Sequence, residues 1–551
     1  MIQLTIDGKI VKTDDGATIL DAARAVGIDI PTMCHIDKKI SPVSCFVCVV
    51  KVEGQDNFVP SCATVVREGM AVDTSSDEVT DCRRRALELM LSEHAGNCEA
   101  PCTRICPCGL DIPEMVRNLL AKDDDAALRT LKKAMPFPAT LGYICPALCK
   151  KGCRRAVIDA AIPIQKIHKD IAEKAINTPA HNNNIDIAKT NSKNIAIIGS
   201  GPAGLSSAYF LTIKGYSCTI FESQSKIGGT LKSRFDESTL PQKILDAEIE
   251  SIKNLGVKFI VDKKINTIDE IYDDYDAIII ATGLDGSDIA KEHPEWLQGN
   301  NITKEHPGGV QSSVENTQNK RTAPQRGAKN DRQQLFGLEY DTHGIKTCHD
   351  TLMTSRPKVF ACGSSRRPVR IVARSVGQGM AVAISVDNYL SAKTTGKPFF
   401  VNIGHLSTDE MESLAKSIPY TGKGINTDDI NGDTANCLQC DCGKKDSCVL
   451  RAHAIQYNAH HMRYATGHRK EYIRRLYNDS GLIHEPGKCT ACGRCVNITR
   501  ERGVNPGLSF TGRGSDVYVS APFGADIDKA MGEVLNECVD SCPTGALWVR
   551  T

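Results

Sequence analysis

The sequence predicts a multi-domain chain that combines domains of the α+β and α/β classes, and three observations lead to this prediction. The chain has 551 residues, too many for one hydrophobic core, so roughly three to five domains are expected. Most of its 24 cysteines stand in tight groups. Between these groups, the apolar run Ile195–Ile198 leads into a glycine-rich turn, Gly199–Gly204, which is typical of a parallel α/β sheet.

Charge and hydropathy exclude several classes of function. Lys and Arg total 67 and Asp and Glu total 66, so there is no basic excess that would favour a nucleic-acid partner. No stretch approaches the ~20 apolar residues that span a bilayer. The first residues enter an alternating strand pattern without a signal peptide. We therefore expect a cytoplasmic location, no membrane partner and no nucleic-acid partner.

The grouped cysteines are interpreted as metal ligands. Disulfide scaffolds are usually short secreted chains, whereas clustered thiols in a long chain without a signal peptide are more often ligands. The alternative, a set of disulfides, is the weaker interpretation.

The N-terminal segment predicts a small sheet, a helix and a four-thiol site. Asp7–Gly8 is a hairpin turn signal, and Thr18–Asp21 has a capping-box pattern that opens a helix. The spacing C-x10-C-x2-C-x13-C then places thiols at Cys34, Cys45, Cys48 and Cys62. A [2Fe–2S] cluster takes four thiolates, two on each iron, and Cys45 and Cys48 on one loop can bind together. A structural zinc ion on the same thiols is the alternative.

This spacing and its flanking residues resemble the N-terminal domain of the large iron–sulfur subunit of respiratory NADH dehydrogenase and of iron-only hydrogenases. The resemblance implies a β-grasp, ferredoxin-like domain over residues 1–80.

Residues 81–180 are predicted to be mostly helical, with cysteine-rich turns at 94–108 and 145–153. The turns resemble the N-terminal domain of the glutamate synthase small subunit and of dihydropyrimidine dehydrogenase, where two [4Fe–4S] clusters share ligands from both. The resemblance implies one cluster held by His94, Cys98, Cys102 and Cys153. It implies a second cluster held by Cys106, Cys145, Cys149 and His168. Both histidines replace other residue types of that family, and each has an alternative interpretation as a packing residue; Cys108 is left over.

The glycine-rich turn predicts a nucleotide site. Gly199 permits the tight turn, Gly201 allows the backbone to approach a pyrophosphate, and Gly204 allows the helix to pack closely on the strand. The next strand ends at Glu222, where an acidic residue holds a ribose hydroxyl.

Residues 190–400 resemble the flavin domain of the glutamate synthase small subunit, which implies bound FAD. The contacts implied are Gly199, Gly201, Pro202, Ala203, Gly204, Glu222, Gly229, Thr230, Thr282, Gly283, Gly363 and Ser364. Ser364 replaces the usual Asp of that family. A full second nucleotide domain is missing between Gly283 and Gly363, where we expect a polar insertion at about 284–335.

The C-terminal part contains further thiol groups. Within residues 401–480, a cysteine-rich linker domain, one group comprises Cys437, Cys440, Cys442 and Cys448. Soft ligands at this density suit either zinc or a [4Fe–4S] cluster, so the metal is left open. Residues 481–551 contain a C-x2-C-x2-C motif and a distant Cys-Pro, a [4Fe–4S] signature, which assigns Cys489, Cys492, Cys495 and Cys542. This segment again resembles the NADH dehydrogenase iron–sulfur subunit and implies a C-terminal ferredoxin-like domain.

The resemblances together imply an iron–sulfur flavoprotein subunit of a cytoplasmic NAD(P)H-dependent complex, such as an electron-bifurcating transhydrogenase or hydrogenase. Its cofactors would be a [2Fe–2S] cluster, three or four [4Fe–4S] clusters, FAD and, as the alternative to the fourth cluster, zinc. Its partners would be an NADH dehydrogenase-type flavoprotein subunit, a small [2Fe–2S] subunit and ferredoxin, in a hetero-oligomer. Two alternatives remain: a self-sufficient NAD(P)H:acceptor oxidoreductase, and a zinc-stabilised scaffold, which leaves the nucleotide turn unexplained.

Overall fold

The fold divides into two compact units. A computed structural model describes residues 1–37, 42–178, 187–283, 336–393, 401–418, 434–464, 470–513 and 516–549. Unit 1 comprises residues 1–105, 149–163 and 395–551, and unit 2 comprises residues 106–148 and 164–394. The helical segment predicted over residues 81–180 is therefore divided between the units. The polar insertion expected at about 284–335 lies outside the described residues.

Unit 1 begins with a five-stranded sheet of order β2-β1-β5-β3-β4. Its strands are β1 (Ile2–Ile6), β2 (Lys9–Thr13), β3 (Val49–Val52), β4 (Val59–Pro60) and β5 (Ala71–Asp73). Strand β1 is antiparallel to β2 and parallel to β5. The hairpin turn predicted at Asp7–Gly8 is confirmed, since both residues have positive φ, 48° and 77°, as a tight two-residue hairpin turn requires.

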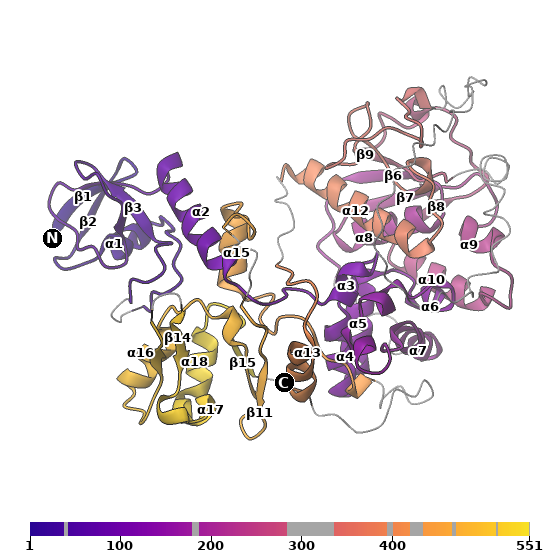
Figure 1. The fold of residues 1–551 in the computed structure, drawn as a ribbon. Helices are drawn as coiled ribbons and strands as arrows, with labels where there is room; N and C mark the ends of the chain where they lie inside the picture. The colour runs from indigo at the N-terminus through magenta and orange to yellow at the C-terminus, as the bar shows by residue number, and fades with distance from the viewer. Residues whose placement is uncertain are drawn as a thin grey trace, which may run out of the picture. The chain divides into compact units, whose positions relative to one another are not determined.

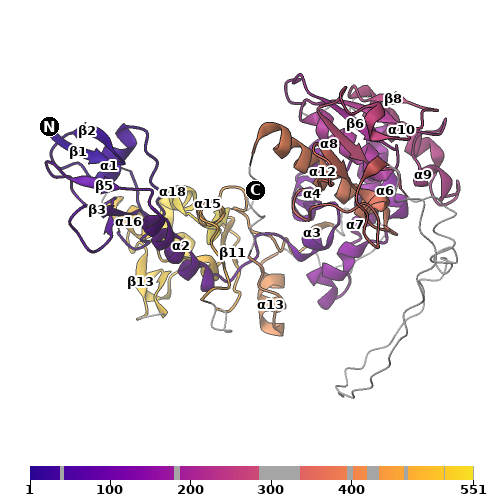
Figure 2. The same ribbon diagram turned by 90° about the horizontal axis from the view of Figure 1, so that it is seen from above.

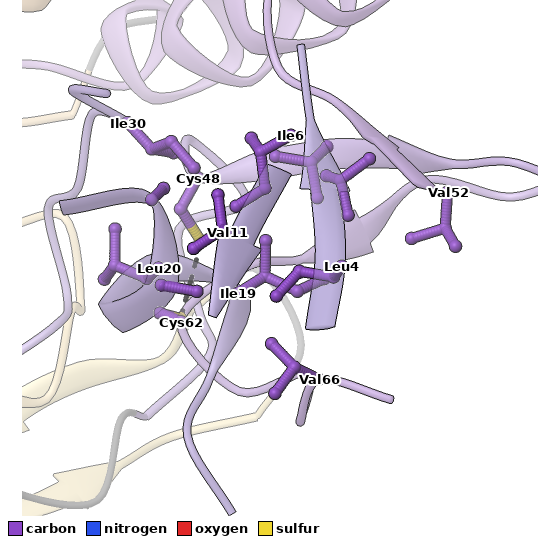
Figure 3. Packing of buried hydrophobic residues seen from close by; sticks show 14 residues of the cluster. Leu4, Ile6, Val11, Ile19, Leu20, Ile30, Cys48, Val52, Cys62 and Val66 are labelled. Carbon is purple, nitrogen blue, oxygen red and sulfur yellow. Dashed lines mark hydrogen bonds between the residues drawn. The ribbon is translucent and has the colours of Figure 1, made fainter. Parts of the chain in front are cut away.

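Helix α1 (Ile19–Ala25) covers this sheet. The predicted capping box is confirmed, because the Thr18 side chain accepts the Asp21 N–H and the Asp21 carboxylate accepts the Thr18 N–H. Apolar side chains of α1 and the sheet, among them Leu4 and Ile19, form a buried core around Cys48 and Cys62 (Figure 3). The mixed sheet and its helix form the predicted ferredoxin-like fold.

The rest of unit 1 consists of helices and a small C-terminal sheet (Figure 1). The helices are α2 (Asp77–Ser92), α3 (Pro101–Ile105), α13 (Thr408–Lys416), α15 (Val449–Gln456), α16 (Arg494–Glu501), α17 (Ile527–Met531) and α18 (Leu535–Ser541). The antiparallel sheet β11-β12-β15 comprises Arg475–Tyr477, Leu482–His484 and Leu547–Val549, and a hairpin pairs β13 (Ser509–Thr511) with β14 (Tyr518–Ser520).

Unit 2 is built on a parallel sheet of order β10-β9-β6-β7-β8. The strands are β6 (Asn194–Ile198), β7 (Ser217–Phe221), β8 (Lys258–Ile260), β9 (Ala277–Ile280) and β10 (Val359–Ala361). Strand β9 is buried along its whole length, as expected for a parallel sheet covered on both faces. Its register with β6 and β10 confirms the predicted α/β class.

Helices α8 (Pro202–Ile213) and α12 (Val372–Ser391) pack against each other beside this sheet (Figures 1 and 2). The other helices of unit 2 are α4 (Ile112–Leu120), α5 (Asp124–Ala134), α6 (Pro138–Ile144), α7 (Ile164–Asn177), α9 (Thr230–Ser233) and α10 (Gln242–Asn254).

One buried carboxylate joins the helical part of unit 2 to the nucleotide-binding part. Glu248 of α10 accepts the N–H groups of Ala139 and Thr140, each at 2.8 Å, at the start of α6. These two donors belong to the first turn of a helix, where the N–H groups have no partner within the helix. Glu248 therefore fixes α6, and the segment leading to Cys145, against the nucleotide domain.

Candidate functional site

The four N-terminal thiols come together in two close pairs. Cys34 Sγ lies 3.4 Å from Cys45 Sγ, and Cys48 Sγ lies 3.4 Å from Cys62 Sγ; Figure 3 shows the second pair. The two pairs also adjoin each other. Hydrogen bonding to the Cys45 side chain lowers the pKa of Cys34 most, and hydrogen bonding to the Cys62 side chain, from the other pair, lowers it further. Two thiolates on each of two irons is the arrangement of a [2Fe–2S] cluster. The pairing differs from the expectation that Cys45 and Cys48 bind together.

A second group of thiols in unit 1 brings together residues that are far apart in the sequence, namely Cys98, Cys442 and Cys448. Burial raises the pKa of Cys98, and the Cys442 thiolate raises it further. Burial likewise raises the pKa of Cys448 to about 12, with further contributions from Cys442 and Cys98. The backbone agrees, since Cys442 N–H donates to the Cys98 carbonyl O at 3.3 Å.

His94 lies next to this second group. Burial, with a smaller contribution from the Lys488 charge, lowers the pKa of His94 to about 4, so its imidazole is neutral. Its buried Nδ1 has no hydrogen-bond partner. A neutral imidazole with a nitrogen available suits a metal ligand.

A third group of thiols surrounds Cys102, four residues after Cys98 in the sequence. Burial raises the pKa of Cys102 well above its ordinary value, and the thiolates of Cys437, Cys440 and Cys153 contribute in that order. Cys149 is a further neighbour of Cys102 within unit 1.

These positions correct the predicted grouping. Cys102 and Cys153 lie with Cys437 and Cys440 rather than with Cys98 and His94. The thiols of the Cys437–Cys448 segment are divided between two neighbourhoods, because Cys437 and Cys440 lie near Cys102 and Cys153, whereas Cys442 and Cys448 lie near Cys98. Sequence reasoning missed this division because the partners are separated by more than 280 residues.

The C-terminal thiols converge on one cavity, which brings together all four predicted ligands. The cavity is lined by Cys489, Cys492, Cys495 and Cys542, with Gly493, Val519 and Ile527 among the other lining residues. His484 also lines it, and its buried Nδ1 has no hydrogen-bond partner.

In the described part of the chain, no three His, Cys, Asp or Glu side chains converge closely enough to chelate one metal ion. Thiolates of a [4Fe–4S] cluster bind different irons, so such ligands surround a volume rather than a point.

Unit 2 contains a smaller group of thiols. Cys106 and Cys108 are hydrogen-bonded, and this contact lowers the pKa of Cys106 to about 6. Cys145 is a further neighbour of both. Cys108, which the sequence pattern left over, therefore belongs with the predicted ligands; its Cys-x-Cys step from Cys106 was the available signal. Cys149, predicted as a ligand of this site, belongs to unit 1.

His168 is held in a defined orientation in unit 2. It is buried on α7, and its Nδ1 lies 3.2 Å from the Pro138 carbonyl O. If Nδ1 donates to this carbonyl, Nε2 is the nitrogen left for a ligand, an arrangement common for metal-bound histidines.

The nucleotide turn has the close packing that its glycines predict. Gly199 has φ 104°, and a methyl group there would lie 2.6 Å from the Ala281 carbonyl O. A methyl group at Gly204 would overlap the Gly199 carbonyl O. At Gly201, by contrast, a methyl group would meet no atom within 4 Å, which leaves open space at the start of α8 for a phosphate group.

The remaining predicted nucleotide contacts gather around this turn. A methyl group at Gly229 would lie 2.9 Å from Gly201 Cα, and one at Gly363 would lie 2.9 Å from Ala203 Cβ. Thr230 begins α9 directly after Gly229, Thr282 and Gly283 follow β9, and Ser364 follows β10. The site therefore forms at the carboxyl ends of the parallel strands, where such sheets bind ligands.

Two polar contacts organise the same site. The Glu222 carboxylate accepts the N–H and the hydroxyl of Ser200 at 2.9 and 2.6 Å, so the acidic residue is fixed beside the turn. Ser364 Oγ accepts the Val369 N–H at 3.2 Å. The residues present thus fit a dinucleotide, with an open phosphate position and a buried acid beside it.

The folds and thiol groups define an iron–sulfur protein with a Rossmann-like nucleotide-binding domain, and three domain families match separate segments of the chain. Residues 1–77 match the 2Fe-2S iron-sulfur cluster binding domain. Residues 77–180 match dihydropyrimidine dehydrogenase domain II, 4Fe-4S cluster, and residues 197–249 match the NAD(P)-binding Rossmann-like domain. The combination of iron–sulfur and nucleotide-binding domains is therefore confirmed.

Curated relatives share parts of the chain. The NADP(+)-dependent formate dehydrogenase subunit beta of Moorella thermoacetica is 34% identical over 211 residues, which is 34% of this chain and 30% of the relative. The NAD-dependent dihydropyrimidine dehydrogenase subunit PreT of Escherichia coli (strain K12) is 30% identical over 208 residues, 36% of this chain and 49% of PreT. The NADP-reducing hydrogenase subunit HndD of Solidesulfovibrio fructosivorans is 48% identical over 103 residues, 18% of each chain. The chain spans about half or less of each of these relatives.

None of the helices in the described ranges is both long and apolar enough to cross a bilayer.

Proposed function

We propose that this chain is an iron–sulfur flavoprotein subunit that transfers electrons within a cytoplasmic, hetero-oligomeric NAD(P)H-dependent oxidoreductase complex. The observation that supports this most directly is one shared core in unit 1. That core includes Cys34 and Cys45 of the N-terminal site and Cys98 of the second group, and Cys448 of the second group and Cys492 of the C-terminal site pack against it. Redox sites that are packed around one core lie close together, as a chain that passes electrons from site to site requires.

Four ligand sets are proposed in unit 1. The N-terminal thiols Cys34, Cys45, Cys48 and Cys62 hold a [2Fe–2S] cluster. Three [4Fe–4S] clusters are proposed at His94/Cys98/Cys442/Cys448, at Cys102/Cys153/Cys437/Cys440 and at Cys489/Cys492/Cys495/Cys542. In unit 2, Cys106, Cys108 and Cys145 are the thiols proposed for a further cluster, with His168 as the non-thiol ligand.

Backbone contacts support direct exchange between neighbouring sites. Val449 N–H, next to Cys448, donates to the carbonyl O of Pro543 at 2.9 Å, and Pro543 follows Cys542. On the other side, Ser44 Oγ donates to the Cys492 carbonyl O at 3.4 Å. The C-terminal site therefore lies next to both the second group and the N-terminal site. Short separations are what one-electron steps between clusters need.

FAD, where bound, exchanges two electrons with a nicotinamide and passes single electrons to clusters. This chain's contribution is to bind and orient it: α8 directs its N-terminus at the pyrophosphate, and Glu222 takes the ribose. We propose FAD rather than NAD(P) for the site at Gly199–Gly204 because residues 190–400 resemble a flavin domain, and the segments at Gly229 and Gly363 that belong to this resemblance lie against the turn.

The main proposal is a relay that meets nicotinamide through partners. These would be an NADH dehydrogenase-type flavoprotein subunit, a small [2Fe–2S] subunit and ferredoxin, in a bifurcating transhydrogenase or hydrogenase. It is supported by the names of the relatives, which are subunits of formate dehydrogenase, dihydropyrimidine dehydrogenase and hydrogenase. The alternative is a self-sufficient NAD(P)H:acceptor oxidoreductase.

An anaerobic reduction experiment distinguishes the two. The purified chain, with its iron content measured, receives NADPH, then NADH, then dithionite, while flavin and cluster absorbance are recorded. A relay should bleach with dithionite and with neither nucleotide. Rapid bleaching by either nucleotide would establish the self-sufficient oxidoreductase, and a chain without flavin or iron would refute both.

A further inference from the structure

A buried group of charges lies beside the proposed cluster at Cys98, Cys442 and Cys448. Glu485 accepts hydrogen bonds from Lys488 Nζ at 2.7 Å and from Arg474 Nε at 3.1 Å, and all three side chains are about 1% exposed. Tyr472 OH and Trp548 Nε1 complete the shell of the carboxylate, at 2.9 and 3.0 Å. The group holds two cations and one anion. Burying an excess positive charge is costly unless another anion lies nearby.

Other negative groups lie nearby: Asp441 and Cys440 act on Arg474, and Cys442 is the thiol on the side of Lys488. A methyl group added at Gly545 would overlap Cys442 Sγ and would lie 3.8 Å from Lys488 Nζ. The Cys442 thiol and the Lys488 ammonium therefore both lie close to Gly545. A methyl group at Gly96 would overlap Lys488 Cε and stand 2.8 Å from its Cγ. The Lys488 side chain therefore runs between two glycines, across the His94–Cys98 loop, to the thiol of Cys442.

Electrostatic effects agree with this geometry. Burial alone would lower the pKa of Lys488, but the Cys442 thiolate and the Glu485 carboxylate outweigh burial and raise that pKa. Lys488 Nζ also donates to the Glu485 carboxylate at 2.7 Å, and this buried ion pair holds the lysine as an ammonium. Burial raises the pKa of Cys98 and of Cys448, and the Lys488 charge opposes that rise at both thiols. One ammonium therefore acts on all three proposed thiolate ligands.

We propose that Lys488 sets the reduction potential of the cluster at Cys98, Cys442 and Cys448, by stabilising its reduced form with a fixed buried charge. The proposal rests on the proposed function of this site. Reduction adds one electron from a donor and one negative charge to the cluster, and no bond forms or breaks. A positive charge nearby favours that state, and the effect is strong where the dielectric is low. Lys488 acts on the cluster through its charge and does not bind iron.

The test is a redox titration of the whole chain, followed by EPR. The signal of this cluster is identified as the one that Cys448→Ser removes. In Lys488→Met, which keeps the length of the side chain, the equilibrium constant for reduction should fall at least tenfold, about 59 mV for one electron. In Glu485→Gln, which removes the compensating anion, the constant should rise. Lys416→Met, at an exposed lysine 79% accessible, is the matched control and should leave it unchanged.

The outcomes separate the two proposals. The role of Lys488 is refuted if the potential of the Cys448-dependent signal is unchanged in Lys488→Met. It is also refuted if that potential shifts in the same direction in Lys488→Met and in Glu485→Gln. Either result leaves the cluster assignment intact. If no signal depends on Cys448, the cluster assignment fails, and the role of Lys488 fails with it. If Lys488→Met does not retain iron, the upward shift in Glu485→Gln decides, because loss of packing alone would not favour reduction.

Discussion

Replacing Gly201 or Gly204 by alanine should separate stability from nucleotide binding within one turn. A methyl group at Gly204 would overlap the Gly199 carbonyl O, whereas one at Gly201 would have open space. Gly201 also has φ −69° and ψ 178°, which any residue adopts. Overpacking costs about 1–3 kcal/mol, and an alanine inside a helix recovers up to about 1 kcal/mol relative to glycine. Because the methyl group would overlap a backbone oxygen, the cost at Gly204 should fall at about 2–3 kcal/mol, the upper part of that range, which leaves a net loss of about 1–2 kcal/mol.

That loss corresponds to a fall in Tm of roughly 2–8 °C for a unit of this size. Compared as flavin-free chains, Gly201→Ala should have an unchanged Tm, but it should fail to retain FAD, because its methyl group occupies the space proposed for the pyrophosphate. Calorimetry measures the first quantity, and flavin released per chain measures the second. Full FAD content in Gly201→Ala would refute the proposed phosphate position, and an unchanged Tm in Gly204→Ala would refute the packing argument.

Three further predictions address the thiol groups, the helix contact and the buried acid. Cys442→Ser and Cys437→Ser should remove different EPR signals, with a loss of up to about four irons each; loss of one common signal would favour a single site instead. Glu248→Ala leaves two buried N–H groups without an acceptor, so the free energy of unfolding should fall by about 2–4 kcal/mol. The exposed Glu250→Ala should change it by less than about 0.5 kcal/mol, and equal denaturation curves would contradict this. Burial opposes ionisation of Glu485, but the neighbouring guanidinium and ammonium outweigh it and hold its pKa at about 2. Its carboxylate therefore stabilises the fold above about pH 4.3 and loses this effect as the pH falls toward 2. Glu485→Gln should flatten that part of the acid-unfolding curve, followed by circular dichroism, and an unchanged curve would count against it.

Local patterns predicted the elements that depend on a few neighbouring residues. The hairpin at Asp7–Gly8 and the capping box at Thr18–Asp21 form as expected, because turn and cap geometry follow from backbone preferences and short-range hydrogen bonds. The turn at Gly199–Gly204 joins β6 to α8 as its spacing predicts, since Gly204 packs against the Gly199 carbonyl within the same βα unit. The three thiols Cys489, Cys492 and Cys495 stand on one short loop and line one cavity for a similar reason, whereas Cys542 reaches that cavity from a distant segment.

The sequence by itself determined which residue types can bind iron and a nucleotide, and in which segments they stand. Only the tertiary structure decided which thiols share a site. Cys98 meets Cys442 and Cys448, which are far away in the sequence, and Cys145 joins Cys106 and Cys108. The ion pair at Lys488 and the carboxylate of Glu248 were equally hidden, because neither belongs to a motif. Spacing along the chain fixes contacts within a loop or turn, whereas contacts between distant segments depend on how complete domains pack.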